Sequence, residues 1–267
     1  MKSKILGFLV ALAALSALPA AAADYTFKFG HAAASTHLFQ TGLEMFAKKV
    51  ADKTGGKVEI QVFGDRQLGD DKQLLEGLQL GTIDGALVSA PVLPLVIGAS
   101  AFDALQLPFV VDTYEQMSAA LSSETGQKIL DTLGAKNIRG FGFIEAGQRH
   151  FLAKKEVAKV ADFAGLKTRI VPIPLHKATW EAVGVNPIGL PYGEVYSALE
   201  TGTIDAVEIN LSSVQSESLY QNAKHVTLTG HDVWPGVIMM GSAKFDALPD
   251  EIKTAMIEAG HEVIAEH

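Results

Sequence analysis

The chain has 267 residues, of which 48% are hydrophobic and 19% are charged, enough for a sizeable core in one large or two medium domains. The formal net charge of −8 argues against nucleic acid as a partner, because nucleic-acid binding needs clustered lysine and arginine. Cysteine is absent, which excludes disulfides, a thiol nucleophile and a lipid-attachment cysteine.

Residues 1–23 have the pattern of a secretion signal. Lys2 and Lys4 give a basic start, an apolar stretch covers 5–18, and Ala21 to Ala23 offer a small-residue cleavage site. A membrane anchor is the alternative, but this stretch is too short to cross a hydrocarbon layer about 30 Å thick. We expect cleavage after Ala23 and a periplasmic protein that is not membrane-embedded. Loss of the two lysines would take the net charge from −8 to −10.

The first predicted elements alternate between strand and helix. Residues 25–30 alternate as a strand should, and a helix over 38–50 follows, with Ser35 or Thr36 as its cap. A second alternating strand covers 58–63. The next helix opens with Asp70 and Gln73 spaced as a capping box and ends at Gly81. This order indicates an α/β lobe, a sheet covered by helices.

One helix-to-strand connection occurs twice. The stretches "GLQLGTIDGAL" at 77–87 and "ALETGTIDAVE" at 198–208 share Gly-Thr-Ile-Asp. Gly81 and Gly202 suit the left-handed position past a helix end, and a buried strand is expected from Thr82 and from Thr203. We interpret the pair as one unit in each of two α/β lobes. The alternative is one larger sheet with two similar connections.

The remaining segments complete the predicted second lobe. Residues 137–157 read as a glycine-punctuated strand that crosses between the lobes. Prolines bound a helix over 175–183 and another that reaches Leu199. A last helix starts near Asp250 and is still helical at 267, so we expect the chain to be truncated at its C-terminal side.

Signatures of catalysis and of cofactor binding are weak. In "GFGFIEAG" at 140–147 the third glycine comes too late for a dinucleotide loop, and in "HEVIAEH" at 261–267 the histidines fall on different helix faces. No third ligand accompanies His31 and His37, and no serine sits in a nucleophile elbow. We therefore expect no cofactor, no metal and no enzyme.

Arginine is scarce, with four residues against 18 lysines. A chain that uses arginine so rarely is expected to keep some of it for the planar two-point grip on a carboxylate, which lysine cannot make. Arg149 follows the crossing strand, and Arg169 precedes the apolar pair Ile170-Val171, so Arg169 should be partly buried and need an anion. The alternative is an internal salt bridge.

Polar side chains follow the predicted strands, where ligands of open α/β sheets bind. The strands after the repeated turns lead to Ser89, and to Glu208 and Asn210, while His31 lies at the end of the first strand. These four are candidate cleft residues, with helix capping as the alternative for the first three. Trp180 and Trp234 could stack on a ligand, although packing is the favoured interpretation.

The chain resembles the extracytoplasmic substrate-binding proteins of TRAP transporters, the DctP-like family, over essentially all of 24–267. The matching stretches are "FKFGHA" (27–32), "RQLGDDKQLLEGLQLGTIDGAL" (66–87), "LQLPFVV" (105–111), "DFAGLKTRI" (162–170), "PYGEVYSALETGTIDAVE" (191–208) and "FDALPDEIK" (245–253).

This resemblance implies a two-lobed periplasmic-binding-protein-like α/β fold with a hinged central cleft. We assign 24–146 and 234–267 to lobe I and 147–233 to lobe II. The family's ligand-binding arginine corresponds to Arg169, its second basic residue to Arg149, its aromatic to Tyr192 and its acidic residue to Asp71. The family asparagine falls on Ile209, and Asn210 follows one place later.

The function implied is capture of a small organic acid in the cleft by a monomer, and its delivery to the membrane subunits of a TRAP transporter. Two alternatives are a periplasmic sensor subunit for the same acid and a secreted enzyme that uses Glu208 or Asp71 as acid or base. Monocarboxylates, dicarboxylates and sugar acids all remain open as ligands.

Overall fold

The computed structural model describes residues 23–266. The predicted secretion signal therefore lies outside the described residues, except for Ala23. Within this range, no helix combines the length and the hydrophobicity needed to cross a membrane.

Eight strands of the described chain form one mixed sheet, in the order β2-β1-β3-β8-β4-β7-β5-β6. Their bounds are β1 (Tyr25–His31), β2 (Val58–Phe63), β3 (Gly85–Ser89), β4 (Ile138–Ala153), β5 (Lys167–Ile170), β6 (Asn186–Gly189), β7 (Ala206–Asn210) and β8 (His225–Gly241). The strands of the β1–β3 group are parallel to one another, as are those of the β5–β7 group, and the long strands β4 and β8 run antiparallel to their neighbours.

Helices cover the sheet. The α-helices are α1 (Leu38–Lys53), α2 (Asp71–Leu80), α3 (Val92–Ile97), α4 (Tyr114–Ser122), α5 (Glu124–Asp131), α6 (Pro174–Ala182), α7 (Val195–Thr201), α8 (Leu211–Ser216), α9 (Ser242–Asp246) and α10 (Asp250–Glu266). The 3₁₀-helices are η1 (Ser100–Gln106), η2 (Thr132–Lys136), η3 (Val160–Phe163), η4 (Tyr192–Glu194) and η5 (Leu219–Gln221).

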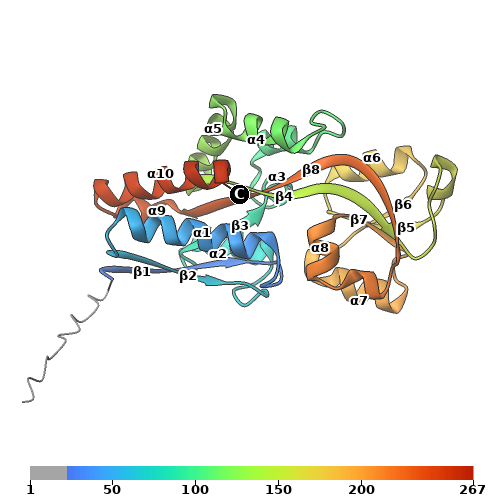
Figure 1. Cartoon of the computed structure of the whole chain (residues 1–267), viewed down its shortest axis with the longest axis horizontal. Helices are drawn as coiled ribbons and strands as arrows, with labels where there is room; N and C mark the ends of the chain where they lie inside the picture. Colours follow the sequence, from blue (N-terminus) through green and yellow to red (C-terminus); the bar gives the residue numbers. More distant parts are fainter. Residues whose placement is uncertain (1–22, 267) are drawn as a thin grey trace, which may run out of the picture.

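The chain forms two α/β lobes, as predicted (Figure 1). We call the β1–β3 group with α1, α2 and α10 the first lobe, and the β5–β7 group with α6, α7 and α8 the second lobe. Strands β4 and β8 run through both, and they join all the strands into one hydrogen-bonded sheet. The repeated turn was interpreted either as one unit in each of two lobes or as two connections of one large sheet. The structure has both features, because the two lobes share one continuous sheet.

The repeated turn occupies equivalent positions in the two lobes. Gly81 and Gly202 are left-handed, with φ of 72° and 77°. Asp84 Oδ2 accepts from Lys28 N of β1 at 2.8 Å, and Asp205 Oδ2 accepts from Lys167 N of β5 at 3.1 Å. The aspartates thus fasten each turn to the neighbouring parallel strand.

Two local predictions were wrong. The strands after the repeated turns begin at Gly85 and Ala206 rather than at Thr82 and Thr203, because Thr82 and Ile83 still bond back to the Gly77 carbonyl at the helix end. The cap of α1 is His37, whose Nδ1 accepts from Phe39 N at 3.1 Å, rather than Ser35 or Thr36. The capping box of Asp70 and Gln73 is confirmed.

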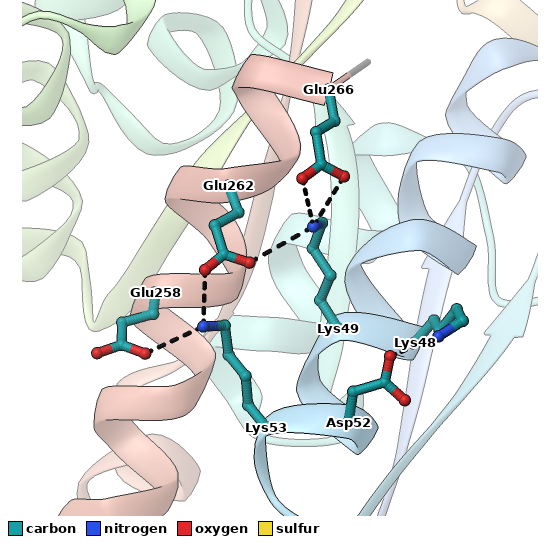
Figure 2. A network of polar contacts seen from close by, with 7 residues as sticks. All are labelled: Lys48, Lys49, Asp52, Lys53, Glu258, Glu262 and Glu266. Atoms are coloured by element: carbon teal, nitrogen blue, oxygen red, sulfur yellow. Dashed lines mark hydrogen bonds and ion pairs between the residues drawn. The ribbon is translucent and has the colours of Figure 1, made fainter.

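The first lobe is closed by α10, which packs beside α1 (Figure 2). Lys49 and Lys53 of α1 pair with glutamates spaced one turn apart on α10, namely Glu258, Glu262 and Glu266. Beneath these pairs, Phe46 and Met256 are fully buried in the same hydrophobic cluster. The salt bridges lie on the rim, so apolar burial rather than ion pairing supplies most of the attraction.

The crossing strands are irregular where they pass from lobe to lobe. The β4–β8 register shifts between Glu145 and Gln148 and again between Arg149 and Phe151. Gly147 lies inside the first irregularity with φ of 99°, a value that favours glycine. Bulges of this kind bend a strand and redirect its side chains. Here the bend precedes Arg149.

Candidate ligand-binding site

A cavity of about 580 Å³ lies between the two lobes. Its apolar wall includes Phe39, Val92, Leu95, Val96, Ile209 and Trp234. Its charged lining residues are Asp70, Asp71, Lys72, Glu76, Arg149, Arg169 and Glu194. A largely apolar cavity with a few placed polar groups is the usual form of a small-molecule site.

Arg169 of β5 is buried at the cavity wall, with 3% of its surface exposed. Its Nε donates to the Leu190 carbonyl oxygen at 3.0 Å. Within the described residues, no carboxylate forms an ion pair with this guanidinium, so the internal salt bridge considered as an alternative is absent there. Burial lowers the pKa of Arg169 to about 10, against the opposing effect of Glu208. The side chain therefore stays cationic at neutral pH and has donors available to a ligand.

Arg149 of β4 lines the same cavity but is fixed by protein groups. Its Nε and Nη2 contact the Glu208 carboxylate, and Nη2 also donates to the Glu208 carbonyl oxygen at 2.6 Å. The guanidinium carbon lies 3.7 Å from the centre of the Trp234 ring, a cation–π geometry. Arg149 is thus held by a carboxylate and an aromatic face at the edge of the site.

Glu208 of β7 is completely buried behind Arg149 and is not part of the cavity lining. His176 Nδ1 and His231 Nε2 lie 3.4 and 3.7 Å from its carboxylate oxygens. Burial alone would raise the pKa of Glu208, but Arg149 and His176 hold it well below its usual range. Despite these histidines, no group of three side chains among the described residues is arranged to hold a metal ion.

Asn210 lies at the end of β7 and reaches the cavity. Its Nδ2 donates to the Ala146 carbonyl and to Ser212 Oγ, both at 2.6 Å, and its Oδ1 accepts from Ser213 Oγ at 2.7 Å. Both amide protons are therefore used within the protein. Ile209 also lines the cavity, because the strand turns into α8 at this point.

Tyr192 of η4 lines the cavity, and its buried hydroxyl makes no hydrogen bond of ordinary geometry among the described residues. Burial raises the pKa of this phenol above its ordinary value, although the nearby Ser213 side chain lowers it in part, so the group remains a neutral donor. A buried unpaired hydroxyl is costly in free energy. A ligand oxygen would satisfy it.

Asp71, the first residue of α2, and Ser89, the last residue of β3, lie together on the first-lobe wall. Burial raises the pKa of Asp71 to about 7 and Asp70 adds to the shift, while hydrogen bonding with Ser89 and the charge of Arg169 oppose it. The Asp71 carboxyl therefore keeps its proton to a much higher pH than a free aspartate does, and it can donate as well as accept.

The structure brings six of the eight predicted site residues to the cavity: Arg169, Arg149, Asn210, Tyr192, Asp71 and Ser89. Glu208 does not reach it, because Arg149 from the neighbouring strand covers it. His31 is buried outside the lining, where its Nε2 bonds Gln40 Oε1 of α1 at 2.7 Å.

Sequence reasoning missed several lining residues. His37 lines the cavity and contacts Ser213 Oγ at 3.1 Å, although its place in the sequence indicated only a loop. Trp234 also lines the cavity, and its ring stacks against the Arg149 guanidinium. Trp180 instead packs on Phe151 and Phe163 in the second-lobe core. The predicted return of the chain to lobe I at residue 234 was the available signal for Trp234.

A model of the family described as bacterial extracellular solute-binding protein, family 7 (DctP), matches residues 29–267. The chain belongs to this family. The resemblance inferred from the sequence motifs is confirmed. The prediction that the protein is not an enzyme is confirmed as well, because this is a family of binding proteins.

Named relatives of this protein are periplasmic binding proteins. The chain is 31% identical over 261 residues to the C4-dicarboxylate-binding periplasmic protein DctP of Rhodobacter capsulatus, covering 96% of this chain and 78% of that one. It is 29% identical over 260 residues to the 2,3-diketo-L-gulonate-binding periplasmic protein YiaO of Escherichia coli, covering 96% and 77%.

Solved structures give the same result. The sugar acid binding protein DctPAm from Advenella mimigardefordensis, in complex with galactonate, superposes with a TM-score of 0.85 at 29% identity, over 90% of this chain and 77% of that one. A TRAP periplasmic solute-binding protein from Bordetella bronchiseptica, with density interpreted as pantoate, gives 0.84 at 31% identity, over 91% and 81%. The two-lobed α/β fold of a TRAP solute-binding protein is therefore shared.

Proposed function

We propose that this protein captures a small organic acid in the interlobe cavity, with Arg169 as the principal carboxylate-binding group. The observation that carries the proposal is a buried guanidinium at the cavity wall without a carboxylate partner in the described chain. A carboxylate can accept two parallel hydrogen bonds from one guanidinium, a geometry that lysine does not reproduce.

Arg149 supplies the second cationic group of the proposed site. Glu208 and Trp234 fix its orientation before a ligand arrives, so little side-chain entropy is lost when the ligand binds. Asn210, Tyr192, Asp71 and Ser89 are proposed to contact the rest of the ligand, whereas Glu208 acts through Arg149.

The ligand class follows from what the relatives share. Dicarboxylates, diketogulonate, galactonate and pantoate are the compounds associated with the relatives and solved structures above, and each carries a carboxylate. The rest of the cavity offers the acidic Asp71 on the first lobe and the Tyr192 hydroxyl on the second. Such groups suit ligand hydroxyls better than a second carboxylate, so we place hydroxylated monocarboxylates first.

We propose that the lobes divide where the sequence predicts, into 24–146 with 234–267 and into 147–233, and rotate about β4 and β8. The irregular pairing near Gly147 supports a hinge at this boundary. Closure would expel water from the cavity, which strengthens the ionic contacts. The mature protein, cleaved after Ala23, is proposed to act as a periplasmic monomer that presents the acid to TRAP membrane subunits.

The test is a thermal-shift screen followed by calorimetry. The panel contains D-galactonate, D-glucuronate, D-erythronate, pantoate and succinate, with uncharged galactose as the control. An acid at 100 times its Kd should raise the free energy of unfolding by about 2.7 kcal/mol. The proposal is wrong if no acid binds, or if galactose binds as tightly as galactonate.

The role of Arg169 is tested with the best acid of that panel. Arg169→Lys keeps the charge and removes the fork, so we expect affinity to fall about 10- to 100-fold, given roughly 1.5–3 kcal/mol per hydrogen bond to a charged group. Arg139→Lys is the matched control, since Arg139 packs over Phe245 away from the cavity and should leave affinity unchanged. Equal affinities in the two variants would remove Arg169 from the site.

A further inference from the structure

We propose that Arg66 is an interlobe latch, a first-lobe side chain that holds the second lobe closed beside the ligand cavity by binding Glu217 and the ring of Tyr192. This inference concerns lobe closure and does not depend on which ligand the protein carries. Arg66 precedes α2, whereas Glu217 follows α8 and Tyr192 begins η4.

The latch is a compact set of contacts between the lobes. Arg66 Nη2 lies 2.7 Å from Glu217 Oε2, and Nη1 donates to the Ala32 carbonyl of its own lobe. Its guanidinium carbon is 5.6 Å from the centre of the Tyr192 ring. Glu217 Oε1 in turn accepts from Ala34 N at 2.8 Å. Each partner of the ion pair therefore also bonds the first-lobe backbone.

Burial distinguishes this pair from the surface ion pairs of the molecule. The side chains of Arg66 and Glu217 are 31% and 10% exposed, whereas both partners of Lys48–Asp52 and of Lys128–Glu124 exceed 60%. Less solvent reaches the Arg66–Glu217 pair, so its attraction is screened less than that of an exposed pair. Two hydrogen-bonded backbone groups further restrict its geometry.

The backbone that presents Arg66 is held in an unusual conformation. Asp65 and Arg66 both have positive φ, 54° and 61°, a backbone region that residues other than glycine rarely adopt. Asp65 N donates to the Ala33 carbonyl at 2.8 Å, and Asp65 Oδ1 accepts from Ser35 N at 2.9 Å. These bonds hold the turn in place, and the turn aims the Arg66 side chain at the second lobe.

The second lobe approaches this turn through Gly193. Its N–H donates to Asp70 Oδ2 of the first lobe at 3.2 Å. A Cβ at Gly193 would come 3.0 Å from Arg66 Cδ and 3.3 Å from Asp70 Oδ2. A side chain here would press from the second lobe on both first-lobe groups, and glycine permits the close approach.

Tyr192 connects the latch to the cavity. The side chain lines the cavity and is also the ring over which Arg66 lies. A molecule that packs against Tyr192 from the cavity would limit the motion of this ring, and a fixed ring is a better platform for the guanidinium. Occupation of the cavity and closure of the latch are thereby coupled through one residue.

The experiment measures lobe closure in the ligand-free protein. Because the described chain has no free cysteine and the sequence has none at all, Gln79→Cys on α2 and Glu200→Cys on α7 place two spin labels on exposed sites of opposite lobes. Pulsed electron paramagnetic resonance then gives the distance distribution. In Arg66→Ala we expect the ratio of closed to open molecules to fall about fivefold, the size of a well-placed ion pair.

Two further variants test the geometry. Glu217→Gln should lower the closed fraction in the same direction as Arg66→Ala, and adding it to Arg66→Ala should change little further, because the ion pair is already lost there. Gly193→Ala should open the lobes while keeping every charged group.

The matched control is Lys53→Ala, which removes ion pairs confined to the first lobe (Figure 2) and should leave the distance distribution unchanged. An unaltered distribution in Arg66→Ala and Gly193→Ala, or an equal change in Lys53→Ala, would overturn the latch. The organic-acid screen tests the ligand independently, so the two proposals can fail separately.

Discussion

The two lobes are built from the same β-α-β-α-β unit, and they differ at the strand ends that meet the cavity. The parallel pairing sets the equivalence, because Gly30 stands beside Ala86 as Arg169 stands beside Val207. By the same pairing, Leu87 corresponds to Glu208 and Ser89 corresponds to Asn210. The first lobe therefore has glycine, leucine and serine where the second has arginine, glutamate and asparagine.

This difference shows how one framework can produce an anion site on a single side. A Cβ at Gly30 would come within 3.0 Å of Leu68 and Leu74, so the first lobe fills that space with apolar side chains. The second lobe leaves room there for Arg169. A carboxylate should accordingly meet the second lobe first, and the first lobe should close over the remainder of the ligand.

The largest expected effect comes from giving the second lobe the leucine of the first. Glu208→Leu leaves Arg149 buried without its carboxylate, which should lower the free energy of unfolding by about 3–5 kcal/mol, measured by urea denaturation. Glu181→Leu, the same change at a half-exposed position on α6, should stay within about 0.5 kcal/mol. A loss below about 1 kcal/mol in Glu208→Leu would mean that Arg149 needs no counter-charge.

The repeated aspartates should differ by a smaller amount. Asp84 accepts from Lys28 N and also pairs with Lys244, so Asp84→Ala should cost about 2–3 kcal/mol in unfolding free energy. Asp205 bonds Lys167 N, and the Lys167 ammonium is 3.9 Å away, so Asp205→Ala should cost about 1 kcal/mol. Equal losses in urea unfolding would show that Lys244 contributes nothing to the first turn.

Substitutions of Asn210 and Ser89, the equivalent residues at the ends of β7 and β3, should have the next largest effects on the free energy of unfolding. Asn210→Ala removes three internal hydrogen bonds and should cost about 1–2 kcal/mol of unfolding free energy. Ser89→Ala removes its bonding to Asp71 and should cost about 0.5–1 kcal/mol. Thermal unfolding monitored by circular dichroism compares the two, and a larger loss in Ser89→Ala would contradict the assignment.

A pH dependence of stability is also expected. Burial raises the pKa of Asp71 and of Asp232 to about 7, so between the unfolded pKa of about 4 and pH 7 the folded state binds more protons than the unfolded state. The free energy of unfolding from these groups therefore falls as the pH rises through this range. In Asp232→Asn the drop in Tm between pH 5 and pH 8 should be about 5–10 °C smaller, because about two pH units of linkage at roughly 1.4 kcal/mol each are removed.

Asp246→Asn, at an exposed site on α9, is the control for this titration and should keep the full drop. An unchanged drop in Asp232→Asn would mean that Asp232 is ionised across the whole range in the folded protein. Glu208 acts in the opposite sense, because its lowered pKa removes stability only when the pH falls below about 4.

Local sequence signals predicted much of the framework. The capping box at Asp70 and the left-handed Gly81 and Gly202 are set by neighbouring residues, so a single sequence reveals them. The scarcity of arginine drew attention to this residue type, and the positions of Arg149 after the crossing strand and of Arg169 before an apolar pair singled out these two. Both line the cavity. These features depend on short-range chemistry and on composition.

What the sequence could not predict depends on pairing between distant segments. Glu208 follows a strand as a cleft residue would, but Arg149 arrives from β4 and covers it. His31 ends a strand correctly, yet its ring turns toward Gln40 of α1. The Arg66–Glu217 contact joins residues 151 positions apart, and no local pattern marks either partner.

The two long strands that pass between the lobes also restrict how those lobes can move. Adjacent antiparallel strands cannot slide without breaking several ladder bonds at once, whereas a bulge lets them bend. The proposed lobe motion is thereby directed into rotation about the irregular pairing near Gly147. A membrane protein in contact with both lobes would then distinguish empty from loaded carriers by the angle between two surfaces, without touching the cargo.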